Sequence, residues 1–188
     1  MPKVSAAYVA AKRQEILATA SSLFAEHGFA QVSMADICTQ AGMSAGAIYR
    51  YFPSRDDLVL AVCRARGGDP DRPDETAEAM IDRLLDELDL KHARLVCQIY
   101  AESAVRPDLA AVIDERRGEI RTALARRIAG KEQQAAATAE LVLAGIDGFA
   151  GLVARRAAPD RDAFRRSLHS LVREARSAEK HHEHLSQR

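Results

Sequence analysis

The sequence predicts an all-α protein of about nine helices, arranged as a small domain followed by a larger one. Strong helix formers dominate the 188 residues, aromatic residues make up 5%, and there are 10 glycines and 6 prolines. Apolar side chains recur every three to four residues along most of the chain, which is the period of an α-helix. No stretch has the alternating pattern or the β-branched run that a buried strand would show.

Four helices are predicted within residues 1–66, because apolar stripes of helical period there alternate with capping residues and breakers. The first stripe lies in residues 10–26, and the next three follow Ser33, Ser44 and Ser54. Serine is a preferred N-cap because its hydroxyl accepts a backbone N–H of the first turn. The residues that end the first three helices are Gly28, Gly42 and Pro53.

A linker between two domains is predicted at residues 67–75, because the sequence GGDPDRPDE concentrates Gly, Pro and Asp. Beyond it, residues 76–180 carry five further stripes and predict a larger helical domain. These helices are expected over about residues 77–88, 93–100, 107–130, 132–156 and 164–175. Residues 181–188 form a polar tail that contains His181, His182 and His184. In a terminal tail such a cluster is more typical of solvated side chains than of a metal site.

Composition narrows the class of protein. The 27 basic and 27 acidic residues leave no net charge, which argues against indiscriminate coating of nucleic acid. Residues 1–66 carry seven Lys or Arg against five Asp or Glu, a weak basic excess. Cys38, Cys63 and Cys97 are far apart and show no CxxC spacing, so neither a disulfide framework nor a zinc site is expected, and no cofactor is indicated. No apolar run approaching a membrane span and no signal peptide is recognised, which favours a cytoplasmic protein.

The stretch GMSAG, residues 42–46, has the G-x-S-x-G spacing of a hydrolase nucleophile elbow. That elbow needs a strand before the serine and a sheet beneath it. The segment before Ser44 instead has apolar residues at helical period, and nothing in the sequence places His92 or His169 near it. A serine hydrolase that uses Ser44 is therefore the weaker alternative.

The same five residues fit the turn of a helix-turn-helix. Gly42 suits the left-handed end of one helix, and Ser44 suits the cap of the next. Two short helices joined by a few residues with a glycine form this motif, whose second helix enters the major groove of DNA. That helix contains Tyr49, Arg50 and Tyr51. Two aromatic residues and an arginine on so short a helix indicate a binding surface, because solubility alone does not require them. Small residues at its start would let it approach base edges closely.

Residues 12–62 resemble the N-terminal domain of the TetR family of bacterial transcriptional regulators. The resemblance rests on ILATASSLFAEHGF in the first helix, on Ser33, Gly42 and Ser44 at helix ends, on IYRYF in the third helix and on SRDDL at the start of the fourth. It implies that the following helical region is a variable ligand-binding and dimerisation domain. Ala35 and Ala45 depart from the family, which often has basic residues at these two positions.

Carried over by position, the resemblance implies a set of residues that contact DNA. The serines and Arg55 would contact phosphates, and Arg50 would contact a phosphate or a guanine. The small residues would face base edges, and the tyrosines would reach the backbone or the bases. The residues of this DNA-contact set are Ser33, Ser44, Ala45, Gly46, Ala47, Tyr49, Arg50, Tyr51 and Arg55.

Two further sets are expected in the C-terminal domain. A cavity for an effector would be lined by apolar side chains together with one phenol and one carboxylate. This pocket set is Met80, Leu84, Val96, Tyr100, Glu102, Ile113, Leu124, Ile146 and Phe149. A dimer surface on the last two helices would combine small residues that permit close approach with bulky apolar ones. This dimer set is Ala144, Gly148, Gly151, Phe164, Leu168 and Leu171.

The function expected from these observations is a homodimeric transcriptional repressor that binds a palindromic operator in double-stranded DNA. An unidentified small molecule would release it by favouring a conformation in which the two DNA-binding domains no longer match the operator. A homologue that binds DNA and responds to no ligand fits the sequence equally well. No membrane partner is expected.

Overall fold

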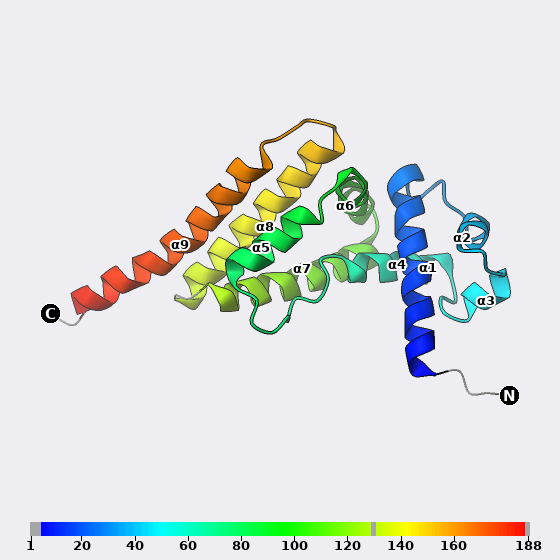
Figure 1. Cartoon of the computed structure of the whole chain (residues 1–188), viewed down its shortest axis with the longest axis horizontal. Helices are drawn as coiled ribbons and strands as arrows, with labels where there is room; N and C mark the ends of the chain where they lie inside the picture. The colour runs from blue at the N-terminus through cyan, green and yellow to red at the C-terminus, as the bar shows by residue number, and fades with distance from the viewer. Residues whose placement is uncertain (1–4, 129–130, 187–188) are drawn as a thin grey trace. The chain divides into compact units, whose positions relative to one another are not determined.

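The computed structural model describes residues 5–128 and 131–186, with side chains up to residue 177 (Figure 1). Within these ranges it contains nine helices and no strand, which confirms the predicted all-α class. Packing divides the chain into two compact units. Unit 1 comprises residues 1–66 and 98–113, and unit 2 comprises residues 67–97 and 114–188. Residues 98–113, which the sequence places in the larger domain, thus pack with the N-terminal helices.

Unit 1 is built on four N-terminal helices. They are α1 (Ala6–His27), α2 (Met34–Ala41), α3 (Ala45–Tyr49) and α4 (Arg55–Ala65). Helix α1 packs against α2 and α4, and α2 packs against α3. The side chains that close this core are Ile16, Ala20, Phe24, Ile37, Ile48, Phe52 and Leu58, all of them buried. The apolar periodicity of the sequence therefore identifies the inner faces of these helices correctly.

The end of α6 (Leu90–Ser103) and the start of α7 (Pro107–Arg127) complete unit 1. Two contacts fasten this segment to α4. Arg66, which ends α4, donates from Nη1 to the Tyr100 hydroxyl at 3.2 Å and lies over the Tyr100 ring. Arg106 donates to Asp56, at the start of α4, at 3.2 Å. Both ends of α4 are therefore held by residues from a distant part of the sequence.

In unit 2, α5 (Ala77–Asp86), α8 (Glu132–Ala154) and α9 (Arg161–Ser186) pack pairwise against one another (Figure 1). Gly145 allows α9 to approach α8 closely, because a Cβ atom there would lie 3.3 Å from Phe164 Cζ and 3.4 Å from Leu168 Cδ2. Phe164 also stacks on Phe149, with 4.8 Å between the ring centroids. The α8–α9 contact within one chain thus depends on a glycine facing two bulky residues.

Helix α8 is long and strongly apolar. Among the described helices it is the one whose length and mean hydropathy, 1.5, reach those of a membrane span. The expectation that no apolar run approaches such a span is corrected on this point. Core helices meet the same criterion, and two acids of α8, Glu140 and Asp147, both accept hydrogen bonds from Arg117 on α7. These ion pairs and the packing on α5 and α9 engage part of α8 with the protein, and a third of its apolar window is buried.

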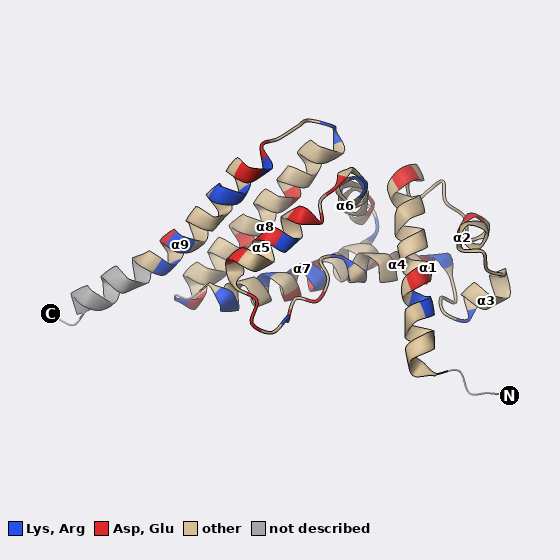
Figure 2. Ribbon diagram, in the orientation of Figure 1, with Lys and Arg blue, Asp and Glu red and all other residues tan. Residues whose placement is uncertain are grey.

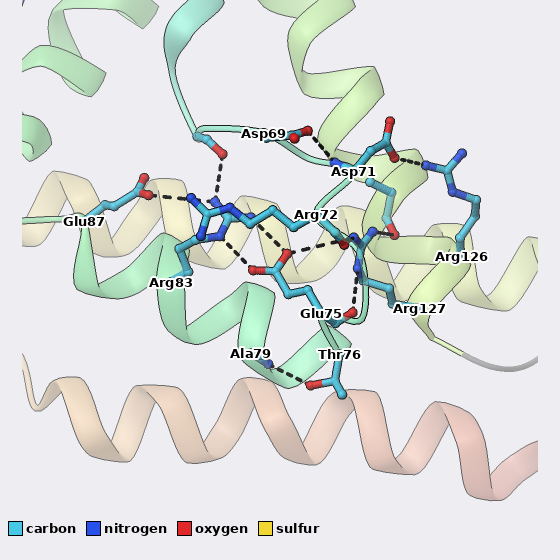
Figure 3. Close-up of polar contacts among 12 residues, drawn as sticks. Asp69, Asp71, Arg72, Glu75, Thr76, Ala79, Arg83, Glu87, Arg126 and Arg127 are labelled. Carbon is cyan, nitrogen blue, oxygen red and sulfur yellow. Dashed lines mark hydrogen bonds and ion pairs between the residues drawn. The ribbon is translucent and has the colours of Figure 1, made fainter.

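The linker before α5 is held firmly within unit 2 by arginines from neighbouring helices (Figure 3). Arg83 on α5 donates to both carboxylate oxygens of Glu75, at 2.8 and 3.2 Å, and to the Gly67 carbonyl at 2.9 Å. Arg127 on α7 donates to the carbonyls of Glu75 and Arg72, each at 2.9 Å. The composition of this segment predicts a linker. In the structure these hydrogen bonds fix its backbone to α5 and α7.

Candidate nucleic-acid interface

The turn between α2 and α3 has the geometry of a helix-turn-helix. Gly42 ends α2 in the left-handed conformation, with φ at 63°. The next residue, Met43, donates its backbone N–H to the Cys38 carbonyl at 3.0 Å, which closes the end of α2. The Ser44 hydroxyl then accepts the Ala47 N–H at 3.3 Å and caps α3. The residues GMSAG therefore form the turn and the start of the second helix, as the sequence analysis favours.

Helix α3 presents one buried face and one exposed face. Ile48 is fully buried and anchors the helix in the core of unit 1. Ser44, Ala45 and Gly46 are exposed, and Ala47 is half-buried. A Cβ atom at Gly46 would meet nothing within 4 Å, so the fold does not require glycine there. The small residues leave a low outer surface at the start of α3, which suits close approach to a groove.

Polar and aromatic side chains follow directly on this surface. Tyr49 is 45% exposed and Arg50 is exposed. Neither side chain makes a hydrogen bond or ion pair with the described part of the chain, which leaves the phenol and the guanidinium available to a partner. Tyr51 is half-buried beside them. Arginine and tyrosine in such positions are suited to phosphate oxygens and to base edges.

Ser33, for which the resemblance implies a phosphate contact, makes several hydrogen bonds within the fold. Its hydroxyl accepts the Asp36 N–H at 3.2 Å and donates to the Asp36 carboxylate at 2.6 Å, and its own N–H donates to the same carboxylate at 2.8 Å. These hydrogen bonds, first that from the hydroxyl, lower the pKa of Asp36. A carboxylate next to Ser33 repels a phosphate, so the serine is placed primarily to cap α2.

Arg55 also has a structural position. Its Nε donates to the Val32 carbonyl at 2.8 Å, and its Nη2 donates to the Phe29 carbonyl. The guanidinium lies 5.8 Å from the centre of the Phe24 ring. Two of its three nitrogens thus donate hydrogen bonds inside unit 1. Arg55 therefore lacks a pair of free donors for the phosphate contact that the resemblance implies.

The geometry of Ser44 does not support a catalytic nucleophile. The element before it is helix α2, whereas a nucleophile elbow follows a strand. Its hydroxyl is occupied with the Ala47 N–H of α3. The two histidines considered as bases pair with acids in unit 2, His92 with Asp89 and His169 with Asp82, each at 2.9 Å. The described residues therefore hold no base against Ser44.

The structure divides the pocket set between the two units. Six of its members are buried in unit 2, namely Met80, Leu84, Val96, Leu124, Ile146 and Phe149. Tyr100, Glu102 and Ile113 instead belong to unit 1. There Tyr100 binds Arg66, and Glu102 lines an open cleft of about 310 Å³ together with Glu26, His27 and Gln98. Sequence periodicity identifies which of these side chains are apolar and buried, but not which unit each one joins.

The dimer set also separates into two groups. Ala144 and Gly148 are exposed on α8 and Gly151 is half-buried, whereas Leu168 is buried and packs with Phe164 on Gly145 of the same chain. Leu171 is half-buried. Leu141 and Leu152, which are 56% and 37% exposed on α8, are not in the dimer set. Their spacing with Ala144 and Gly148, at i, i+3, i+7 and i+11, was the available signal for one exposed apolar stripe on α8.

Comparison with known proteins agrees with this geometry. Residues 16–62 match the sequence profile of a family described as bacterial regulatory proteins, tetR family. The HTH-type transcriptional repressor Rv1474c of Mycobacterium tuberculosis is 41% identical over 64 residues, which are 34% of each chain. The chain thus matches about a third of the length of this curated relative.

Two longer matches extend past the N-terminal domain. The HTH-type transcriptional regulator UidR of Escherichia coli K12 is 28% identical over 134 residues, covering 65% of this chain and 67% of that protein. The structure of Salmonella enterica GusR superimposes with a TM-score of 0.67 at 24% identity, covering 91% of this chain and 99% of GusR. The second match extends the shared fold to nearly the whole chain.

Proposed function

Because its N-terminal domain belongs to the TetR family of bacterial regulatory proteins, we propose that the protein is a homodimeric transcriptional repressor which a small-molecule effector releases from a palindromic operator. One observation carries the proposal: α3 begins after a capped turn and exposes small residues followed by Tyr49 and Arg50. This surface matches what a major groove admits and what phosphates and base edges bind. The protein would act in the cytoplasm, where its DNA is.

Dimerisation is proposed because the surface of α3 that would contact bases is small. Helix α3 spans only Ala45–Tyr49, which offers too few base contacts for a specific site. Two copies related by a dyad double the contacts and place two helices about 34–36 Å apart, or a multiple of that, on a palindrome. The exposed stripe Leu141, Ala144, Gly148 and Leu152 on α8 is the proposed contact between the copies.

The effector is proposed to bind among the helices of unit 2. The six buried members of the pocket set belong to the apolar core of that unit, so a ligand that enters among them is expected to be largely apolar. Such a ligand shifts the population towards the conformation that binds it more tightly, and the coupling free energy appears as lost affinity for DNA.

The test is selection of bound sequences from a random duplex library, followed by fluorescence anisotropy titration of the best duplex. Wild-type protein is expected to select a palindrome and to bind it as a dimer. Arg50→Ala and Tyr49→Ala should each abolish discrimination of that palindrome while the dimer is retained. Arg64→Ala, which removes an exposed arginine of α4 in the same unit, serves as the matched control and should retain discrimination. Unchanged binding by Arg50→Ala and Tyr49→Ala would overturn the proposal.

A further inference from the structure

The N-terminal half of α1 buries no side chain in the described chain, although Arg13 lies over the ring of Phe52. Helix α1 begins at Ala6, yet its first buried side chain is Ile16, which is also the first residue matched by the family profile. Every side chain from residue 5 to residue 15 is exposed except Lys12, which is half-buried. Tyr8 is 57% and Val9 is 42% exposed. This extension is therefore folded as helix without the tertiary burial that stabilises most helices.

The charge of this extension differs from that of the rest of the chain. Residues 1–14 contain three basic side chains, Lys3, Lys12 and Arg13, and no acidic one, although the whole chain is neutral. In Figure 2 the first turns of α1 are tan and are followed by blue. Elsewhere, six of the described helices carry an acid in their first turn. A polyanion is the partner whose charge complements this segment.

One contact positions the extension relative to α3 within unit 1, and a second holds a lysine within α1 itself. Arg13 lies over the ring of Phe52, with its Cζ 4.8 Å from the ring centroid. Lys12 donates to Glu15 at 2.7 Å, and this hydrogen bond raises the pKa of Lys12, with smaller electrostatic contributions from Tyr8 and Tyr51. The turn of α1 that carries Lys12 and Arg13 therefore lies against Phe52, which follows α3. Tyr8 lies one helical turn before Lys12 on the same face of α1.

We propose that Tyr8 and Lys12 bind the phosphate backbone of the DNA that flanks the groove read by α3. This inference rests on the proposed function, because it extends the DNA-binding surface beyond the helix-turn-helix. The lysine supplies a point charge and the phenol supplies a hydroxyl donor, both of which position the protein without reading bases. The exposed pair of Lys12 with Glu15 is weak, so a phosphate oxygen can replace the carboxylate.

The test measures the salt dependence of DNA binding by the full-length dimer. Each phosphate contact adds about one unit to the slope of log affinity against log salt concentration. Lys12→Ala is expected to lower the slope by about 2, one unit for each subunit of the dimer, and to weaken binding about thirtyfold near physiological salt, equally for operator and random duplexes. Tyr8→Phe should weaken binding to the operator and to random duplexes by the same factor, with little change in the salt slope. Lys12→Arg should retain the wild-type slope, and Glu15→Gln should tighten binding because it removes the competing carboxylate.

Lys131→Ala is the matched control, since Lys131 is an exposed lysine before α8 whose side chain makes no capping hydrogen bond. It should leave the slope unchanged. Alanine is a better helix former than lysine, so Lys12→Ala should keep its helix, and circular dichroism checks this. If Arg50→Ala loses the operator while Lys12→Ala keeps the wild-type slope, this inference alone is overturned. If the wild-type protein shows no salt-dependent DNA binding, both this inference and the proposed function are overturned.

Discussion

Arg55 Nε donates to the carbonyl of Val32 at 2.8 Å, and so ties the first residue of α4 to the loop before α2. The same guanidinium donates to the Phe29 carbonyl at the other end of that loop. A single side chain thus joins both ends of this loop. Because the helix-turn-helix begins directly after this loop, Arg55 positions α2, and through α2 it positions α3.

Arg55→Ala should therefore reduce the stability of unit 1. It removes two hydrogen bonds from a charged donor to backbone carbonyls, which we expect to cost about 2–3 kcal/mol in the free energy of unfolding. Arg55→Lys should recover little, because one ammonium cannot reproduce the planar fork that spans two carbonyls. Urea unfolding followed by circular dichroism measures both variants. A stable Arg55→Ala protein whose salt slope for DNA binding falls by about 2, one unit for each subunit of the dimer, would instead show that Arg55 contacts a phosphate.

The ion pair of Glu75 with Arg83 should make stability depend on pH. The hydrogen bond from Arg83 is the largest effect on this carboxyl and lowers the pKa of Glu75 below the usual 4.5. A carboxyl whose pKa is lowered in the folded state stabilises the fold above its unfolded pKa, and this contribution disappears as pH falls through the folded pKa. Glu75→Gln should therefore be less stable than wild type at pH 7, and the gap should narrow as pH falls below about 4.5. Urea unfolding of both proteins from pH 7 to pH 3 measures the gap, and a gap independent of pH would contradict this account.

Cys63 should be chemically silent in the folded protein. Burial raises the pKa of its thiol to about 11, so almost none of it is thiolate at pH 8. Cys38 and Cys97 are only half-buried. A chromogenic disulfide reagent at pH 8 should therefore modify two thiols rapidly and the third only after unfolding in guanidinium. Cys63→Ala should abolish the slow phase, and three equal rates in wild type would show that unit 1 opens readily.

Leu141→Glu should separate the proposed dimer. It places a carboxylate in the exposed stripe of α8, where a two-fold axis would bring two such charges together without partners. We expect the dissociation constant of the dimer to rise at least tenfold, measured by sedimentation equilibrium. Val105→Glu is the matched control, because Val105 is 78% exposed and lies outside α8. Equal dissociation of wild type and Leu141→Glu would exclude this stripe as the interface.

Local interactions explain what could be predicted at the candidate site. Gly42, Ser44 and the N-cap of α2 act within four residues of themselves, so their types and spacing were sufficient to locate the turn. The boundaries of α3 and α1 were less accurate. Helix α3 ends at Tyr49, whereas Pro53 was expected to end it, and α1 begins at Ala6, before the apolar stripe that starts at residue 10. Helix ends depend on small differences in free energy between neighbouring residues.

The roles of single side chains depended on distant partners. Arg55 was expected on a phosphate, but its acceptors lie 23 and 26 residues away and no local pattern encodes them. Gly145 and Gly148 are both small residues of α8, yet one faces Phe164 and Leu168 and the other faces open space. Only the rotation of α8 against α9 distinguishes these two glycines.

By itself the sequence determined the helical class, the turn at residues 42–44 and the family of the N-terminal domain, because periodicity, capping and short motifs are read within a few residues. The tertiary structure alone decided that residues 98–113 join the N-terminal helices, through Tyr100 on Arg66 and Arg106 on Asp56. These contacts join parts of the chain 34 and 50 residues apart. Which of many possible distant partners meet is settled by the packing of whole helices, which no local pattern specifies.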